Sequence, residues 1–174
     1  MKKLFLYASL IACFAGLLTV SCKKAISYPD VPEITFDNLE LWGDTVEIQG
    51  NRIKLSVLSF RIVDGDGDVG LVSENDTSRK TNLVIYFQQK VNGKFINGSY
   101  IDSLKYSTPY IEPGGLDKSL RGTVKVKFFR YYQFSNFDTV RYIYYIVDRA
   151  NQKSNIDTTP PIPYKSKYIR ITRN

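Results

Sequence analysis

The sequence predicts an all-β fold, an antiparallel sandwich of about seven strands. Three observations support this prediction. Apolar side chains recur at every second position over most of the chain after residue 33. Residues that form turns, chiefly Gly, Asn, Asp and Pro, separate the alternating segments. No segment after Cys22 has the 3.6-residue apolar period of a helix.

Each alternating segment is expected to form one strand. The segments are residues 34–41, 53–63, 83–87, 95–96, 124–134, 140–147 and 168–171. The change of parity at Val57-Leu58 predicts a β-bulge. The dipeptide Asn92-Gly93 predicts a tight hairpin turn. Residues 97–121 are expected to form a long irregular connection that includes at most a short strand.

The N-terminus has the plan of a secretory signal peptide. Lys2 and Lys3 are followed by an apolar run over residues 4–20, which ends at Ser21-Cys22. Read as a membrane helix, this run is at the short limit for crossing a bilayer. The predicted organisation is therefore a signal peptide at 1–21, a tether at 22–32 and one β-sandwich domain at 33–174.

Residues 18–22, LTVSC, resemble the cleavage site of bacterial lipoproteins. The resemblance implies that the Cys22 thiol is acylated with fatty acids such as palmitate, and that Cys22 becomes the anchored N-terminus. A second frame ends at Cys13, but cleavage there would leave an apolar stretch exposed. The same segment could instead be an ordinary cleaved signal or an uncleaved anchor. With Cys13 removed and Cys22 acylated, no disulfide remains possible, because the chain has two cysteines.

Composition limits the chemistry open to the protein. The chain contains no histidine and has a net charge of +7. Without histidine or a free thiol, Ser-His-Asp and Cys-His catalysis and His/Cys zinc sites are excluded. No nucleophile elbow, phosphate loop or dinucleotide fingerprint occurs, so we expect a protein that is not an enzyme. A Ser-Lys pair or a carboxylate pair remains possible, and a carboxylate-dependent hydrolase is the catalytic alternative. An exported chain rarely meets nucleic acid, so the positive charge is read as a solvated surface near anionic lipid.

The segment VDGDGDVG places Asp64, Asp66 and Asp68 two residues apart, with glycine between them. Flexible spacers let such carboxylates converge, and Ca²⁺ prefers six to eight oxygen ligands. A second polar segment places Asp148 and Asn151 after the strand expected at 140–147. In an immunoglobulin-like sandwich the loops after the second and sixth strands share one pole. These five residues are therefore predicted to form one Ca²⁺ site.

The alternative for the aspartates is a turn whose charges are paired. Gly-Asp turns are common, and Arg61 or Arg149 lies close enough in sequence to neutralise the group.

Asp138 and Tyr142 have the D-x-x-x-Y spacing of the tyrosine corner, which occurs in immunoglobulin-like sandwiches. Tyr144 then occupies the place of the second core cysteine. Together with the signal, DGDGDVG and the late segment DRANQKSNIDTTP, the chain resembles Bacteroidota lipoproteins that carry an immunoglobulin-like domain. That resemblance implies a fold and an outer-membrane location. In such lipoproteins surface display is associated with acidic residues soon after the cysteine; here the first is Asp30, which favours the periplasmic face.

Aromatic residues crowd residues 128–134 and 142–145, so both faces of these strands carry rings. The second face could bind a glycan or an envelope protein, or its rings could simply pair across strands. The sequence as a whole indicates a lipid-anchored cell-envelope protein that acts as a non-catalytic binding or structural module. The alternative is a glycan-binding component of a nutrient-uptake system.

Overall fold

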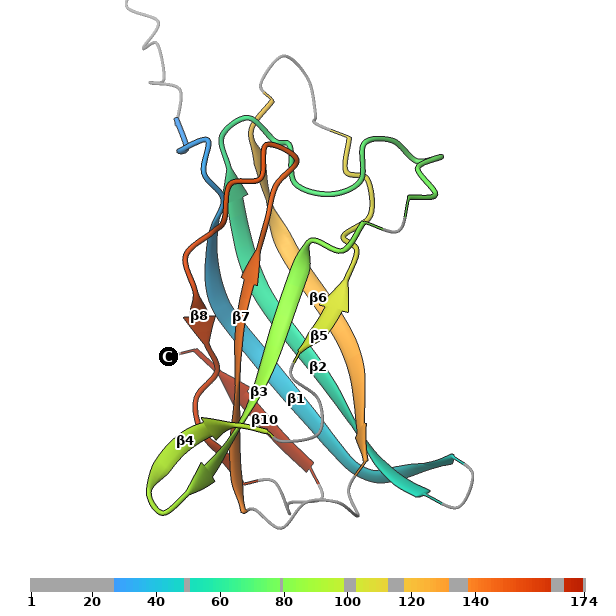
Figure 1. Cartoon of the computed structure of the whole chain (residues 1–174), viewed down its shortest axis with the longest axis vertical. Helices are drawn as coiled ribbons and strands as arrows, with labels where there is room; N and C mark the ends of the chain where they lie inside the picture. The colour runs from blue at the N-terminus through green and yellow to red at the C-terminus, as the bar shows by residue number, and fades with distance from the viewer. Residues whose placement is uncertain are drawn as a thin grey trace, which may run out of the picture.

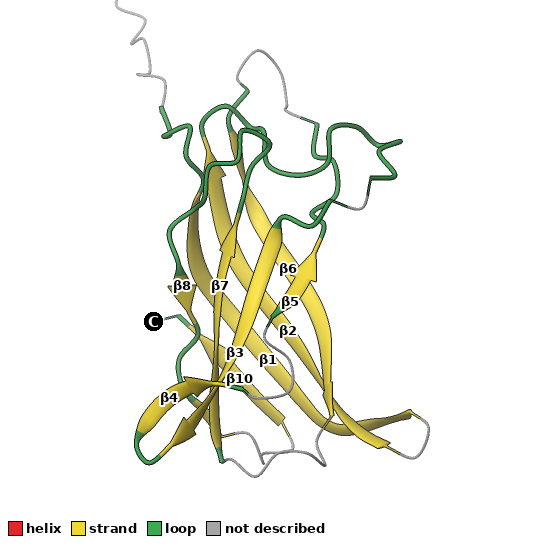
Figure 2. Cartoon of the chain, in the orientation of Figure 1, coloured by secondary structure: helices red, strands yellow, loops and turns green. Residues whose placement is uncertain are grey.

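The structure is a computed structural model of the chain. It describes residues 27–48, 51–78, 80–98, 103–112, 118–131, 138–163 and 168–173. Within these ranges the regular secondary structure is all β (Figure 2). None of the described residues belongs to a helix long and apolar enough to span a membrane. Cys13 and Cys22, and with them the predicted signal peptide, lie outside the described residues.

Two antiparallel sheets pack together and confirm the all-β sandwich that the sequence predicts. The described residues form ten strands where about seven were expected, because the short strands after β7 have no alternating pattern long enough to predict. The strands are β1 (Glu33–Ile48), β2 (Asn51–Asp64), β3 (Leu83–Val91), β4 (Lys94–Asn97), β5 (Leu104–Tyr106), β6 (Leu120–Tyr131), β7 (Thr139–Ile146), β8 (Asp157–Thr158), β9 (Ile162–Pro163) and β10 (Tyr168–Thr172). One sheet has the order β10-β1-β2-β6. The other has the order β4-β3-β7-β8, with β5 paired to β3 and β9 paired to β7. In Figure 1, β3 and β7 lie in front of β1, β2 and β6.

The core lies between the two sheets and is rich in aromatic rings. Strand β7 alternates between partly buried and fully buried side chains along its whole length. Its Tyr142 packs edge-on against Phe128 of β6, with ring centroids 4.9 Å apart. Tyr144 packs against Phe60 of β2 at 5.1 Å. Burial of such rings is the main stabilising term of the fold, since each removes a large apolar area from water.

Two local predictions, a hairpin turn and a β-bulge, have different outcomes. The hairpin at Asn92-Gly93 is confirmed, because both residues have positive φ (49° and 80°) and join β3 to β4. The bulge predicted at Val57-Leu58 is wrong. Strand β2 pairs residue for residue with β6, and the irregularities lie in β1, between Phe36 and Asn38 and between Trp42 and Val46. The apparent parity change has another cause: Leu58 faces the core, whereas Val57 lies on the outer face of the same strand.

Candidate functional site

The acidic segment begins where β2 ends, at one pole of the sandwich. Asp64 is the last residue of β2, and it continues the series of side chains that face the core. The chain then turns through Gly67, whose φ of 64° is unfavourable for residues with a Cβ. A Cβ at Gly67 would lie 1.8 Å from the carbonyl oxygen of Lys118. Glycine at this position therefore allows the loop to curl against the start of β6.

The structure brings this loop against the loop that follows β7, as the sequence predicts. The backbone N–H of Arg149 donates to the carbonyl oxygen of Asp68 (3.2 Å). The N–H of Ala150 donates to Asp68 Oδ2 (3.0 Å). Residues more than 80 positions apart in sequence are thus held together at one pole of the sandwich. We call the group formed by Asp64, Asp66, Asp68 and Asp148 the acidic pole.

Three of the four carboxylates follow one pattern, in which one oxygen is held by the backbone. Asp64 Oδ2 accepts from Val69 N–H (3.1 Å), and Asp148 Oδ1 accepts from Gln152 N–H (2.7 Å). Asp68 is held through Ala150 as described above. These bonds fix the orientation of the side chains, which leaves the second oxygen of each to face its neighbours.

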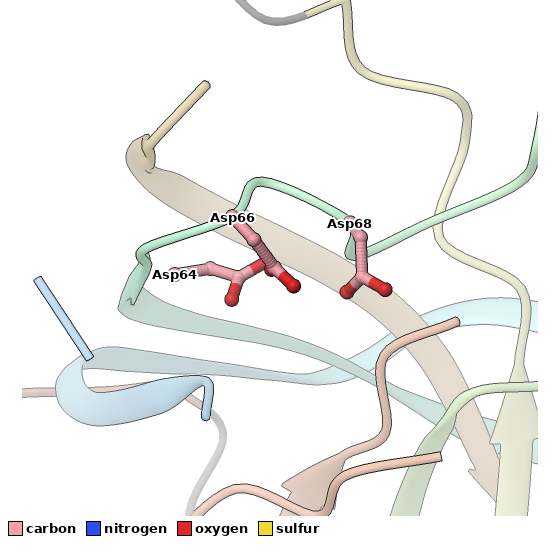
Figure 3. A group of neighbouring side chains, drawn as sticks. All are labelled: Asp64, Asp66 and Asp68. Atoms are coloured by element: carbon pink, nitrogen blue, oxygen red, sulfur yellow. The ribbon is translucent and has the colours of Figure 1, made fainter. Parts of the chain in front are cut away.

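One carboxylate oxygen of each of the four aspartates is buried and has no hydrogen-bond partner among the described residues. These atoms are Asp64 Oδ1, Asp66 Oδ1, Asp68 Oδ1 and Asp148 Oδ2. Ligand oxygens of the three loop aspartates all lie within 4.8 Å of one another. Figure 3 shows the three carboxylates along one turn of the loop. Because buried polar atoms are almost always satisfied, an unpartnered set of acceptors is a set of potential ligands.

The charges at the acidic pole repel one another. Burial, followed by the charges of Asp66 and then Asp68, raises the pKa of Asp64 to about 6 from its ordinary 3.8. Burial, followed by the charges of Asp68 and Asp66, also raises the pKa of Asp148. Each shift means that the ionised form is disfavoured, as expected for carboxylates that converge without a counter-charge.

Neither arginine that could neutralise the group is seen paired with it in the described part of the chain. The guanidinium of Arg149 donates to the carbonyl oxygen of Leu71 (3.2 Å). Arg61 is exposed. Arg170 and Glu40, two residues of the β10–β1 pair, form an ion pair elsewhere in the described part of the chain.

Asn151 lies in the second loop but differs from the four aspartates. It is exposed, has a φ of 65°, and its N–H donates to the carbonyl oxygen of Asp148 (3.3 Å). Asparagine tolerates this left-handed conformation better than most residues, so its backbone role is to close the turn. The ligand role predicted for its side chain stays a prediction.

The N-terminal segment also contacts the acidic pole, a feature that the sequence did not predict. The N–H of Gly65 donates to the carbonyl oxygen of Pro29 (2.7 Å), and Arg121 contacts the hydroxyl of Tyr28 at 3.5 Å. A Cβ at Gly65 would lie 2.4 Å from the carbonyl oxygen of Tyr28. The sequence offers one weak signal for this contact, which is the glycine itself.

No family model, curated protein or solved structure matches the chain. The chemistry of the site must therefore be argued from its geometry. The Asp64, Asp66 and Asp68 group could hold a metal ion. Asp64 is completely buried, so its carboxylate is not accessible to a polymeric substrate.

Proposed function

We propose that the protein is a lipid-anchored, non-catalytic module of the cell envelope, and that Ca²⁺ holds its acidic pole together. The observation that carries the proposal is the set of four buried, unpartnered carboxylate oxygens contributed by two loops. A cation held by Asp64, Asp66 and Asp68, whose ligand oxygens lie within 4.8 Å of one another, would satisfy three of these atoms. It would also offset the repulsion that, after burial, raises the pKa of Asp64.

The donor set favours Ca²⁺ over other common cations. All four side chains are carboxylates, which suit hard cations, whereas structural zinc sites use Cys and His. Mg²⁺ requires near-ideal octahedral geometry and usually retains several waters. Ca²⁺ accepts irregular sets of six to eight oxygens. A loop with glycine between its aspartates is suited to the irregular coordination of Ca²⁺ rather than to the octahedral coordination of Mg²⁺.

The proposed anchor and the proposed ion site are at the same end of the domain. Pro29 is hydrogen-bonded to Gly65, beside Asp64 and Asp66. Even fully extended, the segment from Cys22 to Pro29 spans at most about 25 Å. If Cys22 is acylated, the acidic pole faces the membrane, and calcium stiffens the part of the domain nearest the anchor.

An immunoglobulin-like strand arrangement is part of this proposal. The loops after β2 and β7 meet at one pole, as the loops after the second and sixth strands do in that fold. Tyr142, the tyrosine of the D-x-x-x-Y motif, lies inside the core with its hydroxyl 3.3 Å from Ser56 Oγ of the facing sheet, a contact that differs from the backbone bond of a tyrosine corner.

Thermal unfolding tests the calcium site. For the chain from residue 27 onward, calcium at about 100 times its dissociation constant should add about 2.7 kcal/mol of stability. That increase corresponds to a rise in Tm of about 5–10 °C over the chelator-treated protein. The double variant Asp66→Asn with Asp68→Asn should lose the rise. Glu74→Gln with Glu112→Gln, which removes two exposed charges elsewhere, should keep it. Identical melts with calcium and with chelator would reject the site.

A further inference from the structure

The outer face of the β10-β1-β2-β6 sheet carries a groove that the acidic pole does not explain. The hollow has a volume of about 760 Å³ and is lined by residues of all four strands. The side chains on this face form rows across the sheet, because side chains at directly paired positions lie side by side. The first row is Tyr168, Trp42, Leu55 and Phe129. Trp42 and Leu55 line the hollow, and Tyr168 and Phe129 extend the row beyond it at either end. The second row is Arg170, Glu40, Val57 and Lys127. The third row is Thr172, Asn38, Ser59 and Lys125.

The first row is an exposed apolar platform. Trp42 is 40% exposed, Tyr168 51% and Phe129 54%. Trp42 and Tyr168 pack edge to face, with ring centroids 4.8 Å apart, so each limits the movement of the other. Four strands at a spacing of about 4.8 Å make the row about 14 Å long. Side chains of this size in water are costly unless a ligand covers them.

The second and third rows supply charge and hydrogen-bonding groups. Four cations line the groove, namely Lys125, Lys127, Arg170 and Arg173, against the two carboxylates Asp37 and Glu40. Glu40 is paired with Arg170 at 3.6 Å. The amide of Asn38 donates to Glu40 (3.2 Å), while its Oδ1 has no partner among the described residues. The groove thus combines an excess of positive charge with uncharged hydrogen-bonding side chains.

We propose that this groove binds an anionic polysaccharide chain. A sugar ring has an apolar C–H face that can stack on the aromatic row, and a rim of hydroxyls that suits Asn38 and Thr172. A carboxylate on the sugar would bond to Lys125 or Lys127. The polar rows lie directly beside the aromatic row, so one ligand can reach both.

Two other occupants fit the groove less well. A peptide that adds to a sheet binds along a strand edge, whereas the groove lies on the face of the sheet. A membrane surface would meet the aromatic and basic side chains, but the polar rows line a hollow rather than a raised surface. An acidic peptide nevertheless shares the charge of the proposed ligand, so the test includes one.

The single tryptophan of the chain, Trp42, lies in the groove and reports on it directly. The chain from residue 27 onward is titrated with short oligosaccharides of galacturonic acid and of hyaluronan, with a neutral dextran oligosaccharide as the control. We expect a saturable change in tryptophan emission with at least one acidic sugar and none with dextran. Tyr168→Ala should weaken binding, because it removes one ring of the platform.

Charge variants separate the groove from general attraction. Lys125→Gln with Lys127→Gln should weaken binding about tenfold or more. Lys94→Gln with Lys105→Gln removes two exposed charges from the other sheet and should leave binding unchanged. Lack of a saturable response to both acidic sugars, or equal loss in both double variants, would overturn the proposal. Equal response to dextran, or tighter binding of poly-glutamate, would do the same. None of these outcomes bears on the calcium site, which the melts test separately.

Discussion

Asn155 is hydrogen-bonded to Ile34 through both ends of its side-chain amide. Its Oδ1 accepts from Ile34 N–H (2.7 Å), and its Nδ2 donates to the carbonyl oxygen of Ile34 (2.9 Å). The side chain thereby occupies both backbone groups of a residue in β1, as a neighbouring strand would. Two residues later, a carboxylate oxygen of Asp157 accepts from Phe36 N–H. This segment belongs to the other sheet, so it joins the two sheets at their edge.

We predict that Asn155→Ala lowers the free energy of unfolding by about 1–3 kcal/mol, because it leaves two backbone groups of β1 without partners. Denaturant unfolding of the variant measures the loss. Asn75→Ala, which changes an exposed loop asparagine, is the matched control and should cost less than about 0.5 kcal/mol. Equal stability of the two variants would mean that water replaces the amide without cost.

The stability of the metal-free protein should depend on the ionisation of Asp64. Its pKa is about 6 in the folded protein, above its ordinary 3.8, so the proton binds the folded state more tightly. This contribution to stability is complete below pH 4 and is lost as the pH rises through 6. It amounts to about 3 kcal/mol, since one pKa unit corresponds to about 1.4 kcal/mol.

Other carboxylates titrate in the same range, so the measurement is the difference between wild type and Asp64→Asn in chelator. The variant should gain stability relative to wild type as the pH rises from 4 to 7, and calcium should no longer stabilise it. A constant difference across this range would show that Asp64 ionises normally. Calcium should bind wild type more tightly at pH 7 than at pH 5, because the ligand must lose its proton.

Substitution of Gly67 tests whether calcium affinity depends on the backbone conformation of the loop. Gly67→Ala should destabilise the protein by more than about 2 kcal/mol and weaken calcium binding, since it adds backbone strain and a clash with Lys118. Gly93 has a φ of 80° and nothing within 4 Å of its Cβ position, so Gly93→Ala carries the backbone cost alone. That control should cost about 1 kcal/mol and leave calcium binding unchanged. Equal calcium affinity in both variants would separate the loop from the site.

Much of the fold was predictable because alternation of apolar residues reports burial directly. The pattern over β7 and the turn at Asn92-Gly93 each have a local physical cause, namely a half-buried strand and the positive φ that a tight hairpin needs. The meeting of the two acidic loops was also predictable, because antiparallel topology determines which loops share a pole.

The remaining features depend on contacts that have no local signature. Asn155 and Ile34 are 121 residues apart, and nothing near either residue indicates the pair. The groove was hidden for a different reason. Apolar residues on both faces of β2, such as Val57 and Leu58, look like a change of register in sequence, and only the pairing of the strands shows which face each occupies.

The lipoprotein-like signal predicts that Cys22 is acylated. In cells grown with a labelled fatty acid, the protein should carry the label, because acylation joins the fatty acid to Cys22 covalently. The same chains should hold the protein on the membrane, since each buried CH₂ contributes about 0.8 kcal/mol to attachment. Cys22→Ala should lose the label and release the domain from the membrane. Cys13→Ala is the matched control and should keep both. Label that persists without Cys22 would assign the anchor to another residue.

The segment after the anchor predicts which face of the membrane carries the domain. Lys23 and Lys24 follow Cys22 directly, and the first acid is Asp30, which favours the periplasmic face. Trypsin cleaves after lysine, so it would cut the tether after Lys23 or Lys24. These residues lie between Cys22 and Pro29, where the tether reaches the domain through the hydrogen bond with Gly65. Trypsin added to intact cells should therefore leave the protein anchored. The same treatment after the outer membrane is permeabilised should release the domain, because the tether then becomes accessible. Release from intact cells would instead place the domain on the cell surface, with its groove open to polysaccharides outside the cell.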